Sequence, residues 1–372
     1  MQVKVEKLRE AMRLLEPAVP KKTPLPVLHN VLLKDGKAIA GNMEVFVMID
    51  LPEADMDCLI PHKPVMQLLK YVPGPETLTI EANKELKFTW DGGNASYPLA
   101  KVKDYPVIRE ITAKVKGTLD GNLLINALTS AAHYCARDET RPVLAGVTIF
   151  PGENLDIAAG DGFRMAYQTI AASFPIEQPL IIPSGAVWLI NSLWRHTTPD
   201  AVTGNTLVER VLSKRQIDIA FAEAAKGSPD KLQMCFGNVT VQLILIQGDP
   251  PNFKKLIPSD IPTKVRFFPG DLERAIKRLS AIARDGKGIV RLNWTNDTMT
   301  VSAKSEEMGK IEGTLPVQAD NPGGIALDIS YLLEYLGGKE GYITMGITSK
   351  TAPAVFRHRL SPLVLVMPMF TQ

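Results

Sequence analysis

The segment VEKLREAMRLLE, residues 5–16, gathers its apolar residues on a single face of a helix. They follow the i, i+3, i+4, i+7 spacing that is typical of an amphipathic helix: Leu8, Ala11, Met12 and Leu15. The same spacing returns in NLLINALTSAAHY, residues 122–134, and in GDLERAIKRLSAIARD, residues 270–285. The sequence therefore predicts three helices of one kind, spread along the chain.

The segments that follow these helices repeat as well. LPVLHNVLLK, residues 25–34, follows the first helix, and RPVLAGVTIF, residues 141–150, follows the second. Both are proline-led and aliphatic, which predicts strands. KGIVRLNWT, residues 287–295, takes the corresponding place after the third helix, without the proline. Each copy then continues with a short strand that runs into a second helix, at residues 59–72, 180–194 and 325–338.

This repeat predicts an α+β fold of three similar domains, each with two helices packed on antiparallel sheets. Residues 101–117 and 248–270 are charged or proline-rich, so we expect them to be extended connectors rather than helices. Residues 196–215 have no counterpart in the other copies, and the sequence assigns them no role. The predicted domains are residues 1–117, 118–254 and 255–372.

The composition is that of an ordinary globular chain. Of 372 residues, 45% are hydrophobic and 22% are charged, and the formal net charge is +2. A protein that holds nucleic acid by bulk charge is normally far more basic. Three cysteines without a CxxC pair indicate a reducing compartment and no disulfide framework. The N-terminal segment is charged from residue 4, and no apolar run is long enough to cross a bilayer. We expect a cytoplasmic protein.

Motifs for catalysis are weak. Neither a GxxxxGK[ST] loop nor a GxGxxG loop is present, and the five histidines share no metal-ligand spacing. GDGFRMA, residues 160–166, is the most enzyme-like loop. A charged glycine turn of this kind is more often structural, with Asp161 paired to Arg164. Cys135 and His133 point apart on a helix, which disfavours a nucleophile. The residues therefore predict no catalytic, metal or cofactor site.

Several segments together resemble the bacterial sliding clamp family, the beta subunit of DNA polymerase III. In chain order they are TPLPVLHNVLL, RPVLAGVTI, AAGDGFRMA, PPNFKKLIP, DISYLLEYL and VMPM. The resemblance covers essentially the whole chain. It implies three similar domains of the DNA-clamp fold per subunit, and two subunits that close head to tail into a dimeric ring around double-stranded DNA.

The same resemblance implies a processivity factor for DNA replication rather than an enzyme, and no cofactor. The implied partners are DNA held topologically and without sequence specificity, the DNA polymerase, an ATP-dependent clamp loader and other proteins with a clamp-binding motif. The implied location is the nucleoid in the cytoplasm.

The segment SPLVLVMPMFTQ, residues 361–372, is an apolar strip for which the residues leave two interpretations open. It is a last edge strand that fills the core, or it presents one face to a partner, because strand side chains alternate between faces. The resemblance implies the wall of a peptide-binding groove. The groove residues that it implies are Leu144, Gly162, Phe163, Arg164, Met165, Pro251, Lys255, Leu256, Asp328, Tyr331, Ala352, Ala354, Leu365, Val366, Met367, Pro368 and Met369.

Two further sets of residues follow from the resemblance. Lys22 and Arg141 align with the DNA-contacting positions of the family. Further basic residues lie on polar helix faces that either contact DNA or are only solvated: Arg9, Arg13, Arg274, Lys277 and Arg278. The implied dimer interface joins the first domain of one subunit to the third domain of the other, through Tyr97, Leu99, Ala281 and Ile282.

Two positions depart from the family pattern. Lys287 stands where an aromatic residue lines the partner site in some members, and Asp328 stands where an asparagine can occur. The sequence leaves open whether the chain is encoded by a host or by a phage. Two other classes remain as alternatives: an enzyme with an active-site loop at residues 160–166, and a structural oligomer without a DNA partner.

Overall fold

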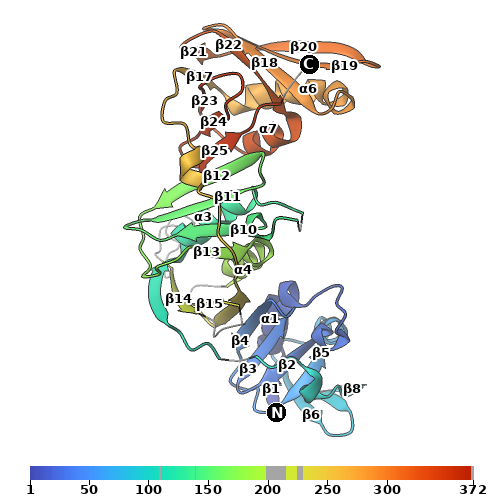
Figure 1. The fold of residues 1–372 in the computed structure, drawn as a ribbon. Helices are drawn as coiled ribbons and strands as arrows, with labels where there is room; N and C mark the ends of the chain where they lie inside the picture. Colours follow the sequence, from blue (N-terminus) through green and yellow to red (C-terminus); the bar gives the residue numbers. More distant parts are fainter. Residues whose placement is uncertain (109, 139, 198–214, 224–228, 370–372) are drawn as a thin grey trace. The chain divides into compact units, whose positions relative to one another are not determined.

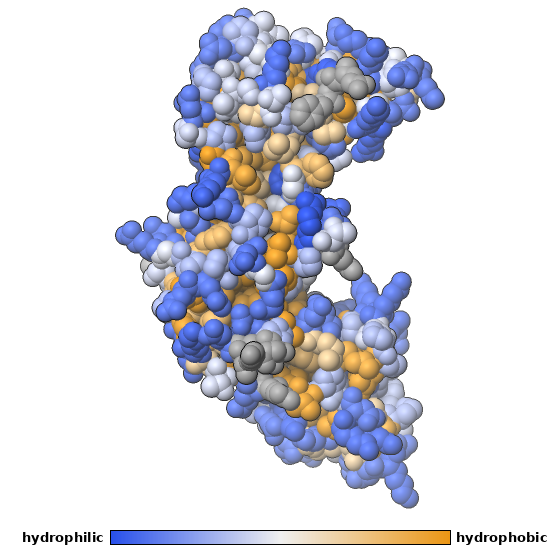
Figure 2. Space-filling view, in the orientation of Figure 1, coloured by the Kyte–Doolittle hydropathy of each residue, from blue (hydrophilic) through white to orange (hydrophobic). Residues whose placement is uncertain are grey.

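The computed structural model describes residues 1–108, 110–138, 140–197, 215–223 and 229–369 (Figure 1). This chain divides into two compact units. The first comprises Met1–Thr129, Phe150–Leu155 and Ala171–Gly248, and the second comprises Ser130–Ile149, Asp156–Ile170 and Asp249–Gln372. Hydrophilic side chains cover most of the face drawn in Figure 2, as expected when apolar residues fill the interior.

The three repeated helices form where their spacing predicts them. They are α1 (Val5–Leu15), α3 (Gly121–Ala132) and α6 (Pro269–Asp285). Each buries all four residues of its predicted apolar face. In α1 these are Leu8, Ala11, Met12 and Leu15; in α3, Leu124, Ala127, Leu128 and Ala131; in α6, Leu272, Ala275, Ile276 and Leu279.

The predicted second helices are confirmed as α2 (His62–Leu69), α4 (Ser184–His196) and α7 (Ile329–Leu336). Pro61 and Pro183 precede α2 and α4 in an extended conformation. Asp328 caps α7, because its side chain accepts hydrogen bonds from the N–H groups of Ser330 and Tyr331. None of the helices in the described ranges has the length and apolar character needed to span a membrane.

The first unit contains two antiparallel sheets. An eight-stranded sheet has the order β5-β2-β3-β4-β16-β15-β14-β9, and a four-stranded sheet has the order β1-β6-β7-β8. β4 and β16 come from different thirds of the chain and pair with Val47 opposite Val241. The strands are β1 (Gln2–Lys4), β2 (Asn30–Lys34), β3 (Lys37–Gly41), β4 (Val45–Asp50), β5 (Cys58–Pro61), β6 (Thr77–Ala82), β7 (Leu86–Trp90), β8 (Gly93–Tyr97), β9 (Val115–Asp120), β14 (Gln216–Ala222), β15 (Lys231–Phe236) and β16 (Val239–Ile244). β13 (Leu180–Pro183) leads into α4.

The second unit repeats this plan. One sheet runs β10-β11-β12-β25-β24-β23-β17-β21, and a four-stranded sheet runs β20-β19-β18-β22. β12 and β25 pair with Met165 opposite Leu365. The strands are β10 (Gly146–Phe150), β11 (Leu155–Gly160), β12 (Arg164–Ile170), β17 (Thr263–Phe267), β18 (Ile289–Trp294), β19 (Thr298–Ser305), β20 (Gly309–Pro316), β21 (Gln318–Ala319), β22 (Gly323–Asp328), β23 (Ile343–Ile347), β24 (Ala354–Arg357) and β25 (Leu363–Val366).

Two sequence predictions are wrong in detail. The proline-led strands begin as 3-10 helices, η2 (Pro26–His29) and η4 (Pro142–Leu144), because proline fixes φ and cannot donate to a sheet. The connectors are not simply extended. The first contains η3 (Val102–Asp104) and part of β9, and the second contains η5 (Phe253–Leu256) and β17. Most of the insertion at 196–215 lies outside the described residues.

Candidate functional site

The apolar strip near residue 365 becomes an interior strand. β25 pairs with β12 on one side and with β24 on the other, so that Val366 lies opposite both Arg164 and Ala354. Val364, Leu365 and Val366 are buried, as the core-filling interpretation predicts, but the strand is not at an edge of the sheet. The strip is therefore an interior strand of the sheet and not its last strand.

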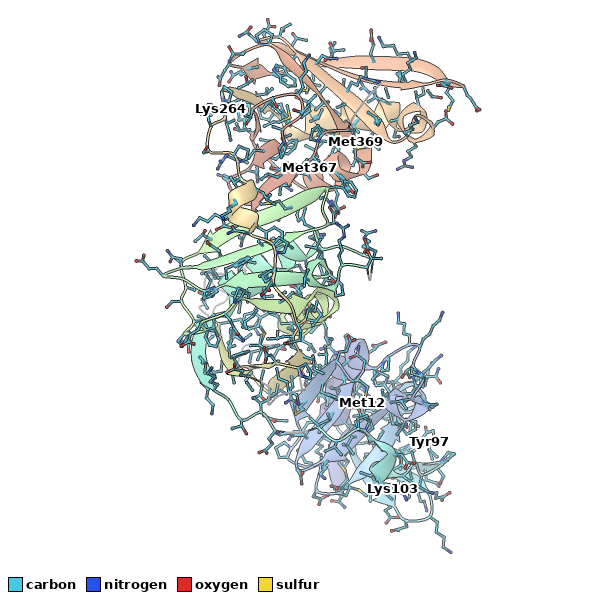
Figure 3. All side chains as sticks on the ribbon, viewed as in Figure 1. Met12, Tyr97, Lys103, Lys264, Met367 and Met369 are labelled. Carbon is cyan, nitrogen blue, oxygen red and sulfur yellow. The ribbon has the colours of Figure 1, made fainter. Side chains whose placement is uncertain are left out.

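Beyond β25 the chain leaves the sheet but stays attached to it. The Met367 N–H donates to the Phe163 carbonyl at 2.7 Å, and the Met369 N–H donates to the Ala326 carbonyl at 2.8 Å. Pro368 is buried between them, while Met367 is 41% exposed. Figure 3 labels both methionines at the end of this segment. These hydrogen bonds hold the backbone of both methionines in place. Their flexible thioether side chains suit the binding of apolar ligands.

Met367 is held by a tight turn between β11 and β12. The Asp161 Oδ1 accepts hydrogen bonds from the N–H groups of Phe163 and Arg164, each at 2.9 Å, and the Asp161 N–H donates to the Arg164 carbonyl. Gly162 has φ +95°, a conformation that other residues rarely adopt. The Phe163 side chain is 58% exposed at the tip of the turn. The turn therefore holds the Met367 backbone and presents an exposed aromatic ring.

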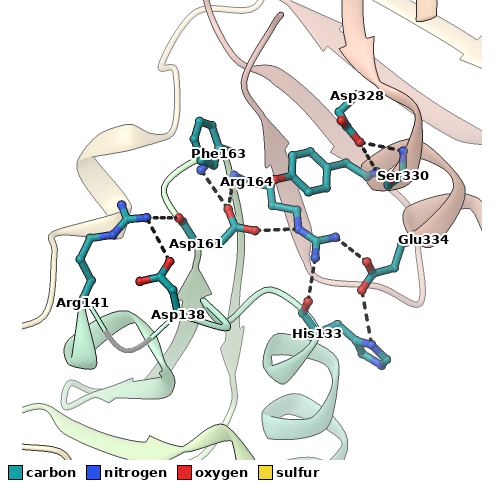
Figure 4. Close-up of polar contacts among 10 residues, drawn as sticks. His133, Asp138, Arg141, Asp161, Phe163, Arg164, Asp328, Ser330 and Glu334 are labelled. Atoms are coloured by element: carbon teal, nitrogen blue, oxygen red, sulfur yellow. Dashed lines mark hydrogen bonds and ion pairs between the residues drawn. The ribbon is translucent and has the colours of Figure 1, made fainter. Parts of the chain in front are cut away.

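Arg164 takes part in a polar network with residues of three segments (Figure 4). Its Nε donates to the Asp161 Oδ2 at 3.1 Å, its Nη1 to the Glu334 Oε2 at 2.9 Å, and its Nη2 to the His133 carbonyl at 3.1 Å. The guanidinium carbon lies 4.5 Å from the centre of the Tyr331 ring and 5.1 Å from that of Tyr134. The predicted pairing of Asp161 with Arg164 is confirmed, and Arg164 is only 6% exposed.

The charges of this network shift two pKa values. Burial lowers the pKa of the Arg164 guanidinium, but the hydrogen bonds and charges of Glu334 and Asp161 outweigh burial and hold the pKa above its ordinary value. Burial also lowers the pKa of His133, and Arg164 and Lys339 add to this effect while Glu334 opposes it. Arg164 is therefore a permanent cation.

The linker after β16 supplies the other side of the candidate site. Phe253 of η5 is buried, and its ring lies 3.0 Å from where a Cβ on Gly160 would sit. The Asn252 side chain caps η5 by accepting from the Lys255 N–H. Leu256 is 54% exposed, and Pro251 is half-buried. The linker thus contributes one exposed aliphatic side chain from a rigid short helix.

The predicted groove residues fall into three groups by exposure. Phe163, Leu256 and Met367 are exposed and can contact a ligand directly. The buried members support the surface from below: Leu144, Arg164, Met165, Ala354, Leu365, Val366 and Pro368. Between these extremes are the half-buried members, which are Pro251, Asp328, Tyr331, Ala352 and Met369; Gly162 and Lys255 are exposed.

Sequence reasoning missed Glu334, Tyr134 and the carbonyl of His133 as parts of this site. Glu334 offered one signal, because it is the single charged residue in the apolar helix ISYLLEYL. Tyr134 and His133 offered none, since their roles depend on a contact with Arg164 that no local pattern encodes. The enzyme interpretation gains nothing here. Burial raises the pKa of the Cys135 thiol to about 12, which keeps it protonated at neutral pH.

The predicted DNA-contacting residues differ in what they already bind. Arg9 donates to the Leu69 and Val72 carbonyls near the end of α2, so its guanidinium is committed within the fold. Arg274 pairs with Asp271, and Lys277 pairs with Glu273 at 2.6 Å. Arg141 donates to the Asp161 carbonyl and lies 3.8 Å from Asp138. The other three are exposed: Lys22, Arg13 and Arg278.

The predicted interface residues lie on or near exposed elements. Tyr97 ends β8, and its ring meets Phe88 edge-on at 5.7 Å (Figure 3). Leu99 and Ile282 are half-buried, and Ala281 is exposed on α6. Among the described strands, β8 pairs only with β7, and β20 pairs only with β19, so each leaves one edge open.

Comparisons with known sequences match most of the chain. The family model described as DNA polymerase III beta subunit, C-terminal domain, matches residues 254–369. The beta sliding clamps of Staphylococcus epidermidis and Staphylococcus aureus are each 23% identical over 352 residues, which cover 89% of this chain and 86% of the relative.

Solved structures agree with this match. The DNA polymerase III beta subunit of Pseudomonas aeruginosa superposes with a TM-score of 0.86 at 19% identity, over 100% of both chains. The sliding clamp of Bacillus subtilis gives a TM-score of 0.82 at 20% identity, over 100% of this chain and 99% of that one. The α+β fold predicted from the repeat is thereby confirmed.

Proposed function

The chain belongs to the family of bacterial DNA polymerase III beta subunits, the beta sliding clamps, and we propose that it works as a DNA sliding clamp in replication. In this proposal it catalyses no reaction. It encircles double-stranded DNA and tethers the replicative polymerase, which then copies long stretches without dissociating. Its proposed location is the nucleoid in the cytoplasm.

We further propose three domains, residues 1–117, 118–254 and 255–372, and a ring of two subunits joined head to tail. The open edges of β8 and β20 support this arrangement, because an unpaired edge strand favours pairing with another chain. A two-fold operation closes such an assembly into a finite dimer. The modest net charge of +2 suits a protein that stays on DNA by topology and must not grip it.

The observation that carries the proposal is the fixed placement of Met367 beside the turn of Phe163. Phe163, Leu256 and Met367 are exposed apolar side chains, and we propose that together they form a surface that binds short linear peptides. The peptides would come from the polymerase, an ATP-dependent clamp loader and other proteins with a clamp-binding motif. Methionine and aromatic side chains repack readily around different apolar ligands, which suits a shared docking surface.

A primer-extension assay on a circular single-stranded template tests this function. DNA polymerase III with its clamp loader should make much longer products per binding event when this protein is added. Phe163→Ser combined with Met367→Ser should abolish the stimulation while the protein stays folded. Unchanged product length with the wild-type protein would contradict the proposal.

A further inference from the structure

The resemblance places Arg164 among the residues that contact a docked peptide, but its surroundings indicate another role. We propose that Arg164 is a positioning residue: together with Glu334 it fixes the turn of Phe163 and the segment of Met367, and it does not touch the peptide. This inference rests on the proposed function of the same surface.

The guanidinium is already engaged on every side that the structure describes. It donates to two carboxylates and one carbonyl, and it lies between the rings of Tyr331 and Tyr134. Its side chain is 5% exposed. Turning it toward a ligand would break its ion pairs with Glu334 and Asp161 and its hydrogen bond to the His133 carbonyl.

The contacts of Arg164 lead directly to the exposed surface. Glu334 on α7 holds the Nη1, and the Nε holds the Oδ2 of Asp161. The other carboxylate oxygen of Asp161 accepts the Phe163 N–H, and the Phe163 carbonyl accepts the Met367 N–H at 2.7 Å. Hydrogen bonds therefore lead from α7 through Arg164 and Asp161 to the backbone of Phe163 (Figure 4), and a further bond joins the Phe163 carbonyl to the backbone of Met367.

This arrangement means that the surface is built before a ligand arrives. Apolar ligands bind more tightly to side chains that need no ordering on binding. Without the ion pair of Arg164 with Glu334, the Arg164 side chain would no longer hold the Asp161 carboxylate in place. The turn of Phe163 would then sample other conformations. Affinity should then fall although no ligand contact has been removed.

Glu334→Gln separates positioning from direct contact. The probe is a fluorescein-labelled peptide from the C-terminal region of the polymerase catalytic subunit, and binding is measured by fluorescence anisotropy. We expect Glu334→Gln and Arg164→Met each to weaken binding about tenfold, and the double variant to be no weaker than Arg164→Met. If Arg164 contacted the peptide, Glu334→Gln would free it and leave affinity unchanged or higher. That result would overturn the inference.

A control and a second measurement complete the test. Glu273→Gln makes the same chemical change in a half-buried glutamate that pairs with Lys277 on α6, and it should leave affinity unchanged. Hydrogen exchange at the Met367 amide should accelerate in Glu334→Gln and not in Glu273→Gln. This measurement needs no peptide, so it decides the inference even if the wild-type protein fails to bind the probe, which would count against the proposed function alone.

Discussion

At the scale of single residues, the chain builds one turn twice. Asn42 accepts from the N–H groups of Glu44 and Val45, as Asp161 does from those of Phe163 and Arg164. The residue after the acceptor has φ +80° at Met43 and φ +95° at Gly162. The Glu44 carbonyl accepts the Ile244 N–H, as the Phe163 carbonyl accepts that of Met367. The two turns thus share one backbone conformation, but in the first turn Met43 occupies the position that favours glycine.

This difference gives a first prediction. Met43→Gly should raise the free energy of unfolding by up to about 1 kcal/mol, since left-handed backbone costs a non-glycine residue roughly 1–2 kcal/mol and glycine returns part of that as unfolded-state entropy. Gly162→Ala should lower the free energy of unfolding, and it should do so by more than Gly92→Ala. A Cβ at Gly162 would lie 2.6 Å from the Arg141 guanidinium, whereas one at Gly92, with φ +82°, would meet nothing within 4 Å. Urea unfolding of the three variants measures each effect.

His133 gives a prediction about pH. Its Nδ1 lies 3.7 Å from the Glu334 Oε1, and its pKa is lowered from 6.5, chiefly by burial. The unfolded chain therefore takes up this proton at a higher pH than the folded chain. The resulting contribution to stability is complete above pH 6.5 and is lost as the pH falls through the folded pKa. His133→Gln should lose less stability than the wild type on acidification in urea unfolding, and identical slopes would contradict this.

At the scale of elements, the structure separates what local patterns encode from what they do not. The repeated helices were predictable because the buried residues of each one, beginning at Leu8, Leu124 and Leu272, recur at helical spacing. β17 was missed because prolines surround TKVRF, whose Val265 and Phe267 alternate into the core. The pairing of β12 with β25 was beyond sequence reasoning, since their contact joins distant segments and leaves no local signal.

Removing residues 367–372 tests the terminal segment as an element. β25 remains, because Val364, Leu365 and Val366 keep their burial and their pairing. The loss of the two N–H bonds of Met367 and Met369 should cost about 1 kcal/mol each, so the protein should still fold and dimerise. Peptide binding should disappear. Met367→Ala with Met369→Ala is the matched control, since it keeps both backbone bonds and removes only the side chains. Outright unfolding of the truncated chain would show that the segment belongs to the core.

At the scale of the whole molecule, the proposed ring makes the oligomeric state a decisive measurement. Leu99 and Ile282 are half-buried, as expected for side chains that lose water in an interface. Buried apolar anchors of interfaces contribute about 2 kcal/mol or more each. Light scattering should show a dimer for the wild type and a monomer for Leu99→Asp or Ile282→Asp. Lys264→Asp, an exposed change on β17, should remain dimeric. A monomeric wild type would count against the ring.

Retention on DNA should depend on topology. Protein loaded on a nicked circle should stay bound and should be released when the circle is linearised. Lys22→Ala, Arg278→Ala and Arg13→Ala should each reduce loading only a few-fold, because single phosphate contacts are weak. Arg9→Ala should instead reduce stability, since its guanidinium holds the Leu69 and Val72 carbonyls. Salt-insensitive binding to a linear oligonucleotide would be inconsistent with this mechanism.

The pairing of β12 with β25 also orders events during protein synthesis. β12 emerges from the ribosome long before Leu363–Val366 exists to cover it, and its edge stays open until then. Phe163 acquires its neighbour Met367 only after 204 further residues have been added to the chain, as the sequence positions show. A polypeptide that ends before Leu363 therefore lacks both the strand that covers the edge of β12 and the Met367 neighbour of Phe163, so it lacks the surface proposed to bind peptides.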